Sequence, residues 1–190
     1  MSKRIRDRKF FARNVDQVAR DLIGCIVLVE DVGGIIVETE SYDPEDEASH
    51  AYQYRRTARN EAMFGLPGQA YVYRSYGMHW CLNFVCGNAS AVLIRALEPT
   101  EGLAKMRKRR GLEDVKKLCA GPGRLCQALG VSKKHDGISL LKSPFELYLP
   151  AKAFSVGAGP RIGITKAINL HRRFCAKNTP FLSKPLKSQN

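Results

Sequence analysis

Residues 25–40 read Cys-Ile-Val-Leu-Val-Glu-Asp-Val-Gly-Gly-Ile-Ile-Val-Glu-Thr-Glu. The stretch contains two apolar, β-branched runs, 25–30 and 35–40, which favour strands. Between them stand an aspartate and two glycines, residues that favour turns. The stretch therefore predicts a β-hairpin, and the fold is built outward from it.

Before the hairpin, apolar residues recur at helical spacing from Val15 to Ile23, between Asn14 as the N-cap and Gly24 as the stop. After it, aspartate, proline and acids in Asp43–Glu47 predict the first turn of a helix that carries His50. Further strands and helices are expected along the rest of the chain. The strands are Ala70–Tyr73, Trp80–Val85, Ala91–Leu97 (stopped by Pro99) and Arg161–Thr165, and the helices are Thr100–Arg110 and one from Gly121-Pro122 to near Gly130.

Strands and helices are mixed here without regular β-α-β alternation. This pattern favours an α+β fold with a largely antiparallel sheet flanked by helices. The length of 190 residues fits one compact domain, 1–190, and no repeat or linker divides it. Basic residues concentrate at both ends, so we expect residues 1–12 and about 183–190 to form basic tails that are solvated or face DNA.

The chain carries 31 basic and 18 acidic residues, a formal net charge of +13. A surplus of this size attracts polyanions and favours nucleic acid as the partner. An anionic membrane surface, the ribosome or a basic housekeeping enzyme are alternatives that charge alone leaves open. Six cysteines lack zinc-site spacing, which indicates reduced thiols, and no apolar run is long enough for a membrane span.

Glu38-Thr39-Glu40-Ser41-Tyr42 ends a predicted strand. The period of two places Glu38, Glu40 and Tyr42 on one side, so a carboxylate and an aromatic ring can share one wall of a cleft. A carboxylate in such a cleft can act as general base toward water. From these residues alone, an edge strand with solvated acids is the alternative interpretation.

Aromatic residues gather around the expected second hairpin, with Tyr76-Gly77-Met78 as its tip. Aromatic groups at a hairpin tip of a basic protein suit insertion between base pairs. Core packing is the alternative, and we expect it for Tyr71 and Trp80.

Arg95 stands in an apolar strand, where an unpaired charge is expensive, so a buried anionic partner is expected and Glu40 is the first candidate. A purely structural salt bridge is the alternative. His50 could equally be a surface histidine, and Asn83 could satisfy sheet backbone. The turn at Gly121-Pro122 could offer N–H groups to a phosphate or be an ordinary helix start. No calcium-loop pattern is present, and no metal site is expected.

A set of blocks resembles the alkyladenine (3-methyladenine) DNA glycosylase family, in that family's order, over roughly residues 10–182. The blocks are Ile36–Tyr42, Pro44–His50, Thr57–Asn60, Met63-Phe64, Pro67-Gly68, Tyr71–Tyr73, Tyr76–Met78, Cys81–Asn83, Val92–Pro99, Gly121-Pro122 and Leu125–Leu129. The chain departs from the family pattern at Tyr52–Arg56, which lacks a glycine before the threonine, and between Tyr42 and His50, which is one residue shorter than in some relatives.

The resemblance implies a role for each matching residue. Glu40 matches the general base, while Arg95 and the backbone carbonyl of Ile164 match the groups that hold the attacking water. The base pocket is matched by Tyr42, His50, Tyr73 and Asn83, and the wedge that enters the DNA minor groove by Tyr76 and Met78.

The expected activity is that of a monofunctional base excision repair enzyme, which flips damaged purines out of duplex DNA and hydrolyses the N-glycosidic bond without a cofactor. We expect a monomer without membrane association, in the cytoplasm and on the nucleoid if bacterial or in the nucleus if eukaryotic. A catalytically silent damaged-DNA-binding protein and a basic single-stranded RNA-binding protein are the alternatives.

Overall fold

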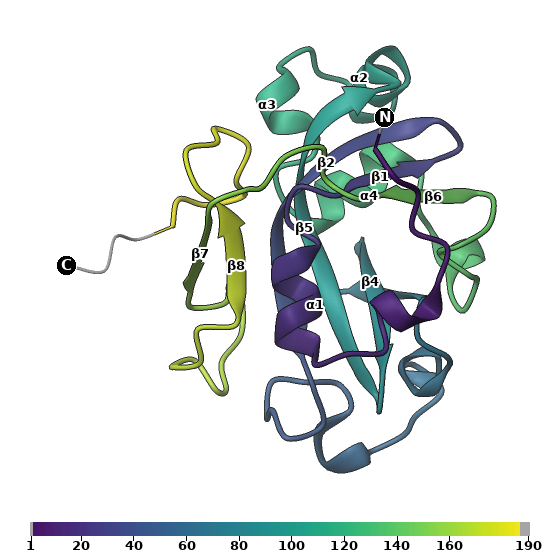
Figure 1. Ribbon diagram of the computed structural model, residues 1–190, viewed down its shortest axis with the longest axis vertical. Coiled ribbons are helices and arrows are strands. Elements are labelled where there is room, and N and C mark those ends of the chain that lie inside the picture. The colour runs from purple at the N-terminus through teal and green to yellow at the C-terminus, as the bar shows by residue number, and fades with distance from the viewer. Residues whose placement is uncertain (1, 187–190) are drawn as a thin grey trace.

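Antiparallel pairing organises the whole sheet of the computed structural model, which describes residues 2–186 (Figure 1). The strands of this part of the chain follow the order β3-β4-β5-β2-β1-β6, with β8 paired to β2 and β7 to β8. They span Ile26–Val29 (β1), Val32–Tyr42 (β2), Ala70–Ser75 (β3), His79–Gly87 (β4), Ser90–Glu101 (β5), Phe145–Tyr148 (β6), Val156–Gly159 (β7) and Arg173–Ala176 (β8). The helices are α1 (Val15–Asp21), α2 (Leu103–Arg110), α3 (Val115–Leu118) and α4 (Pro122–Leu129). The expected α+β class is confirmed.

The hairpin of residues 25–40 is present as β1 and β2, but its turn is shorter than expected. Glu30 and Asp31 make the turn with positive φ angles of 50° and 64°. Gly33 and Gly34 belong to β2, where they allow the backbones of β1 and β5 to approach closely, one on each side. A Cβ at Gly33 would lie 1.9 Å from the carbonyl oxygen of Val27, and one at Gly34 would lie 2.0 Å from that of Glu98.

The long strands β2 and β5 cross the centre of the molecule side by side (Figure 1). The expectation that Pro99 stops the fifth strand is wrong, because β5 continues to Glu101 and Pro99 pairs with Gly34. The register shifts between Gly33 and Gly34, and such an irregularity is a place where a sheet tolerates proline.

Helix α4 has its predicted limits, whereas α1 begins where predicted but ends at Asp21, before Ile23 and Gly24. Asn14 caps α1 by accepting hydrogen bonds from the backbone N–H groups of Asp16 and Gln17. Gly130 ends α4 with a left-handed φ of 75°. Tyr71 is buried, and Trp80 packs against the main core while half-buried, as expected for both.

Two predicted elements are absent within residues 2–186. Residues 43–50 form turns instead of a helix, because the carboxylates of Asp43 and Asp46 pair with Arg172 and Arg161. Residues 161–165 form an irregular loop instead of a strand. In both places tertiary ion pairs outweigh the local signal.

Much of the expected basic tails packs onto the domain. The backbone N–H of Ile5 donates to the carbonyl of Leu147, and Ile5 and Phe11 are buried, so the N-terminal residues cover the β6 end of the sheet. Ser183 lies against Glu38 on β2, while residues 187–190 lie outside the described residues. These contacts tie the described part of each end to the domain, while Lys3, Arg6 and Lys9 stay exposed to solvent.

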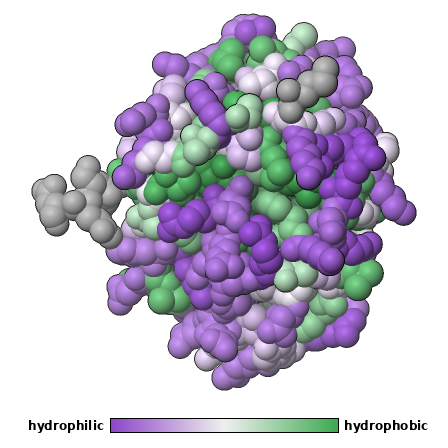
Figure 2. Space-filling view, in the orientation of Figure 1, coloured by the Kyte–Doolittle hydropathy of each residue, from purple (hydrophilic) through white to green (hydrophobic). Residues whose placement is uncertain are grey.

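Hydrophilic residues cover most of the face seen in Figure 2, with smaller apolar patches between them. In the described part of the chain, no helix has the length and apolar character needed to cross a membrane.

Candidate active site

A cavity of about 820 Å³ opens between the β3–β4 hairpin, the centre of the sheet and the loop of residues 162–166. Eight of the nine residues selected from the sequence line it: Glu40, Tyr42, His50, Tyr73, Tyr76, Asn83, Arg95 and Ile164. The ninth, Met78, is not among the lining residues and lies exposed at the hairpin tip.

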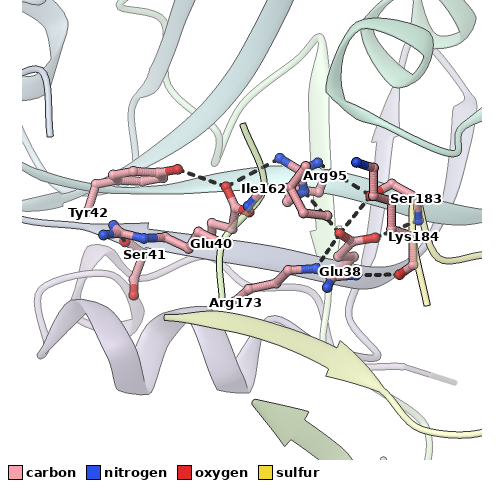
Figure 3. Close-up of polar contacts among 10 residues, drawn as sticks. Glu38, Glu40, Ser41, Tyr42, Arg95, Ile162, Arg173, Ser183 and Lys184 are labelled. Atoms are coloured by element: carbon pink, nitrogen blue, oxygen red, sulfur yellow. Dashed lines mark hydrogen bonds and ion pairs between the residues drawn. The ribbon is translucent and has the colours of Figure 1, made fainter. Parts of the chain in front are cut away.

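Glu40 is fully buried on β2, and three donors hold its carboxylate (Figure 3). One oxygen, Oε1, accepts the backbone N–H of Ile162 at 2.8 Å. The other, Oε2, accepts the Tyr42 hydroxyl at 2.8 Å and Arg95 Nη1 at 3.3 Å. An ionised carboxylate has about four acceptor positions, so this arrangement orients Glu40 and leaves room for one further donor such as water.

Tyr42 contributes its hydroxyl as a donor because it stays protonated. Burial, and next the negative charge of Glu40, raise the pKa of Tyr42 well above its ordinary value. On its other side, the ring lies 4.6 Å from the guanidinium carbon of Arg161. Arg161 is itself fully buried and paired with Asp46, so the loop and the turn of residues 43–50 fix Tyr42 together.

Arg95 has the buried anionic partner expected from its apolar strand. Its Nη1 contacts Glu40, and its Nε contacts a second buried carboxylate, Glu38, at 3.0 Å. Glu38 also contacts Arg173 Nε at 2.8 Å, so the two carboxylates and the two guanidinium groups form one continuous cluster. The strand period of two predicts Glu38 on the same side as Glu40, but no role for Glu38 follows from the sequence.

Three aromatic rings form the wall beside Glu40. The rings of Tyr71 and Tyr73 stack with centroids 5.4 Å apart, and His50 meets Tyr73 edge-on at 4.6 Å. His50 Nδ1 is 2.9 Å from the Tyr71 hydroxyl. His50 is open to solvent on the cavity side, yet desolvation, followed by the charge of Arg59, lowers its pKa to about 4. His50 is therefore neutral at physiological pH.

Asn83 satisfies sheet backbone, one of its two expected roles, and also lines the cavity. Its Nδ2 donates to the carbonyl of Tyr71 at 3.0 Å, which fixes the side chain on β4.

The tip of the β3–β4 hairpin is exposed. Tyr76 is 82% exposed and Met78 is 68% exposed, so neither has a packing role within the domain. Tyr76 and Gly77 both have positive φ angles, 50° and 68°, as a tight turn requires.

The loop after β7 brings a group that the sequence analysis missed. The expected contribution was the carbonyl of Ile164, which lines the cavity, whereas the direct contact with Glu40 comes from the N–H of Ile162. A backbone donor leaves no signature in side-chain identity. Pro122 and Gly123 at the start of α4 lie at the cavity rim. Residues 2–186 contain no cluster of three or more histidine, cysteine or carboxylate side chains that could hold a metal ion.

Comparison with known proteins places this chain in a family. The sequence model of methylpurine-DNA glycosylase matches residues 9–180, most of the chain. The chain belongs to the methylpurine-DNA glycosylase family. It is therefore a DNA glycosylase, a hydrolase of DNA repair, and its substrate is DNA.

Curated bacterial relatives of this chain carry the name "Putative 3-methyladenine DNA glycosylase". One from Rhodopseudomonas palustris (strain BisB18) is 57% identical over 181 residues, which cover 94% of this chain and 90% of the relative. Relatives from Bradyrhizobium diazoefficiens and Rhizobium meliloti are 54% and 53% identical, and the matches cover 94% of this chain and 90% and 96% of theirs.

Proposed function

We propose that this glycosylase removes 3-methyladenine and related alkylated or deaminated purines, namely 7-methylguanine, hypoxanthine and ethenoadenine, from duplex DNA. It hydrolyses the N-glycosidic bond and leaves an abasic site. One observation carries the proposal: a buried carboxylate, Glu40, is held by three donors at the base of an aromatic cavity wide enough for a nucleotide.

In this proposal Glu40 activates a water molecule held also by Arg95 and by the carbonyl of Ile164. Glu40 takes a proton from the water as the water oxygen bonds to C1′ of the sugar. The bond from C1′ to the base nitrogen breaks, and its electron pair leaves with the base. The sugar carries oxocarbenium character in between, and the nearby carboxylate stabilises this positive charge.

The aromatic wall selects the flipped base. Tyr42 and Tyr73 offer ring surface to electron-poor purines, and a cationic base gains roughly 0.5–2 kcal/mol from a face that Arg161 or Arg59 does not cover. Neutral His50 packs against Tyr73 and brings no positive charge that would repel such a base. Asn83 closes the cavity against the amino group of normal guanine.

The hairpin tip and the charge of the protein act before the chemistry. Tyr76 and Met78 enter the minor groove and fill the space of the flipped nucleotide, at a cost of about a few kcal/mol for unstacking. The net charge of +13 holds the protein on the phosphate backbone. A monomer in the bacterial cytoplasm, associated with the nucleoid, suits an enzyme that encloses one lesion.

Single-turnover excision from a duplex with one hypoxanthine or one ethenoadenine tests the proposal. Alkali reveals abasic sites, and Glu40→Gln is compared with the wild type. Glu61→Gln, an exposed carboxylate paired with Arg56, serves as the matched control. We expect abasic product from the wild type and the control, intact strands before alkali treatment, and no product from Glu40→Gln. Tight duplex binding without product from the wild type on any of the proposed lesions would instead indicate a damage-binding protein.

A further inference from the structure

Glu38 is the most heavily bonded carboxylate near the cavity, although it does not line it. It is fully buried, and four hydrogen bonds converge on it. Its Oε1 accepts Arg95 Nε at 3.0 Å, Arg173 Nε at 2.8 Å and the Ser183 hydroxyl at 2.7 Å, while Oε2 accepts the Ser183 backbone N–H at 2.6 Å (Figure 3).

The guanidinium of Arg95 is shared between two carboxylates. Nε binds Glu38 and Nη1 binds Glu40, while Nη2 reaches the Ser183 hydroxyl at 3.4 Å. Each edge of the planar group thus has its own partner, and the plane cannot turn without breaking the contact to Glu38. The hydrogen bond from Nε to Glu38 therefore helps to hold Nη1 in its position toward Glu40.

The negative charge of Glu38 also affects the basicity of Glu40. The cluster holds two carboxylates, Glu38 and Glu40, against two guanidinium groups, Arg95 and Arg173. Without the negative charge of Glu38, both cations would face Glu40 alone, and a surplus of positive charge makes a carboxylate a weaker base. Arg95 would also be free to swing onto Glu40 and occupy the acceptor position that water needs.

The C-terminal segment completes this arrangement from the far side. Ser183 donates twice to Glu38, and the carbonyl of Lys184 accepts a hydrogen bond from Arg173 Nη2. A segment near the end of the chain thereby closes over the groups behind the proposed catalytic base.

We propose that Glu38 is a positioning residue of the glycosylase. Held by two hydrogen bonds from Ser183, Glu38 orients Arg95 and sets the basicity of Glu40. The inference rests on the proposed function, in which Glu40 is the general base. It gives the buried cluster a task in the reaction beyond holding the fold together.

The pH dependence of single-turnover excision separates this role from a structural one. Glu38→Gln keeps the shape of the side chain and removes its charge. We expect its rate at neutral pH to fall about 10- to 100-fold. Its acid limb, which reports protonation of the base, moves to lower pH by roughly one unit. Glu146→Gln removes an equal charge from β6, which is separated from β2 by β1, and should match the wild type in both.

Two further variants keep the proposal open to refutation should Glu38→Gln fold poorly. Ser183→Ala removes the hydroxyl hydrogen bond to Glu38 but keeps every charge, so its rate should fall about 3- to 10-fold while the acid limb stays in place. Arg173→Gln leaves a surplus of negative charge, so its acid limb should move to higher pH. Unfolding in urea, measured for each variant, gives the folded fraction by which the rates are corrected.

An acid limb of Glu38→Gln at the wild-type position, with a rate loss explained by its folded fraction, would overturn the inference. An acid limb of Arg173→Gln that stays at the wild-type position would likewise count against the inference. If the wild type excises bases and Glu40→Gln does not, such a result counts against the role of Glu38 alone. Absence of excision by the wild type counts against the proposed function instead.

Discussion

Tyr42 combines two tasks that a single substitution can separate. Its hydroxyl donates to Glu40 at 2.8 Å, and its ring lines the cavity. Tyr42→Phe keeps the ring but removes one of the three donors that orient the carboxylate. A hydrogen bond to a charged group contributes about 1.5 kcal/mol or more, so we expect the single-turnover rate to fall about 10-fold.

The affinity for a lesion-containing duplex should stay within about twofold in Tyr42→Phe, since the stacking surface is retained. Tyr148→Phe is the matched control, because its hydroxyl also bonds a carboxylate, Glu146, outside the cavity. Equal rates for Tyr42→Phe and the wild type would show that the hydroxyl does not help to orient Glu40.

His50 makes the stability of the protein depend on pH. Its pKa falls from 6.5 to about 4 on folding, chiefly through desolvation. Between these values the unfolded chain binds the proton more readily than the folded one, so the contribution of neutral His50 is complete above about pH 6.5 and is lost as pH falls toward 4. Urea unfolding at pH 7.5 and 5 should therefore show a smaller loss of stability for His50→Gln than for the wild type. His79→Gln, which changes an exposed histidine, should lose as much as the wild type.

Among the secondary-structure elements, the β1–β2 hairpin depends on glycine for space. A Cβ at Gly33 would lie 1.9 Å from the Val27 carbonyl oxygen, a backbone atom that cannot move without displacing β1. We expect Gly33→Ala to lower the free energy of unfolding in urea by more than about 3 kcal/mol.

Gly137→Ala provides the comparison for this prediction. Gly137 has a positive φ of 77° but open space around its Cβ position, so the substitution should cost only about 1 kcal/mol. Similar losses for the two variants would mean that β1 and β2 can separate easily at this point.

The elements that the sequence predicted well are those fixed by local pattern. Both hairpins, α1 and α4 follow from apolar period, caps and turn residues that act over a few positions. The turns of residues 43–50 and the loop at Arg161 could not be predicted in this way, since Asp46 and Arg161 are 115 positions apart and meet only in the folded chain. The same limit applies to the site. Glu40 and Arg95 follow from residue type and context, whereas the contacts from the Ile162 N–H to Glu40 and from Ser183 to Glu38 depend on tertiary packing.

At the scale of the whole molecule, charge and chemistry lie in different places. Most of the surplus of +13 lies in the two ends of the chain, while Glu40 and Arg95 are buried in the sheet. Phosphate contacts release counterions, so affinity for duplex DNA falls steeply with salt, whereas a buried ion pair is screened little. Binding and bond cleavage should therefore respond differently to ionic strength.

We expect the affinity for an undamaged duplex to fall about 10³- to 10⁵-fold between 50 and 200 mM salt, if roughly six to ten phosphates are contacted. The excision rate from a saturated enzyme–DNA complex should change less than about twofold over the same range, because the reacting groups are shielded from the ions. Titration of a labelled duplex measures the first quantity, and quenched single-turnover assays at saturating enzyme measure the second. Parallel loss of both would mean that the ion pair of Glu40 and Arg95 opens to solvent when DNA binds, so that the buried cluster is a property of the free protein alone.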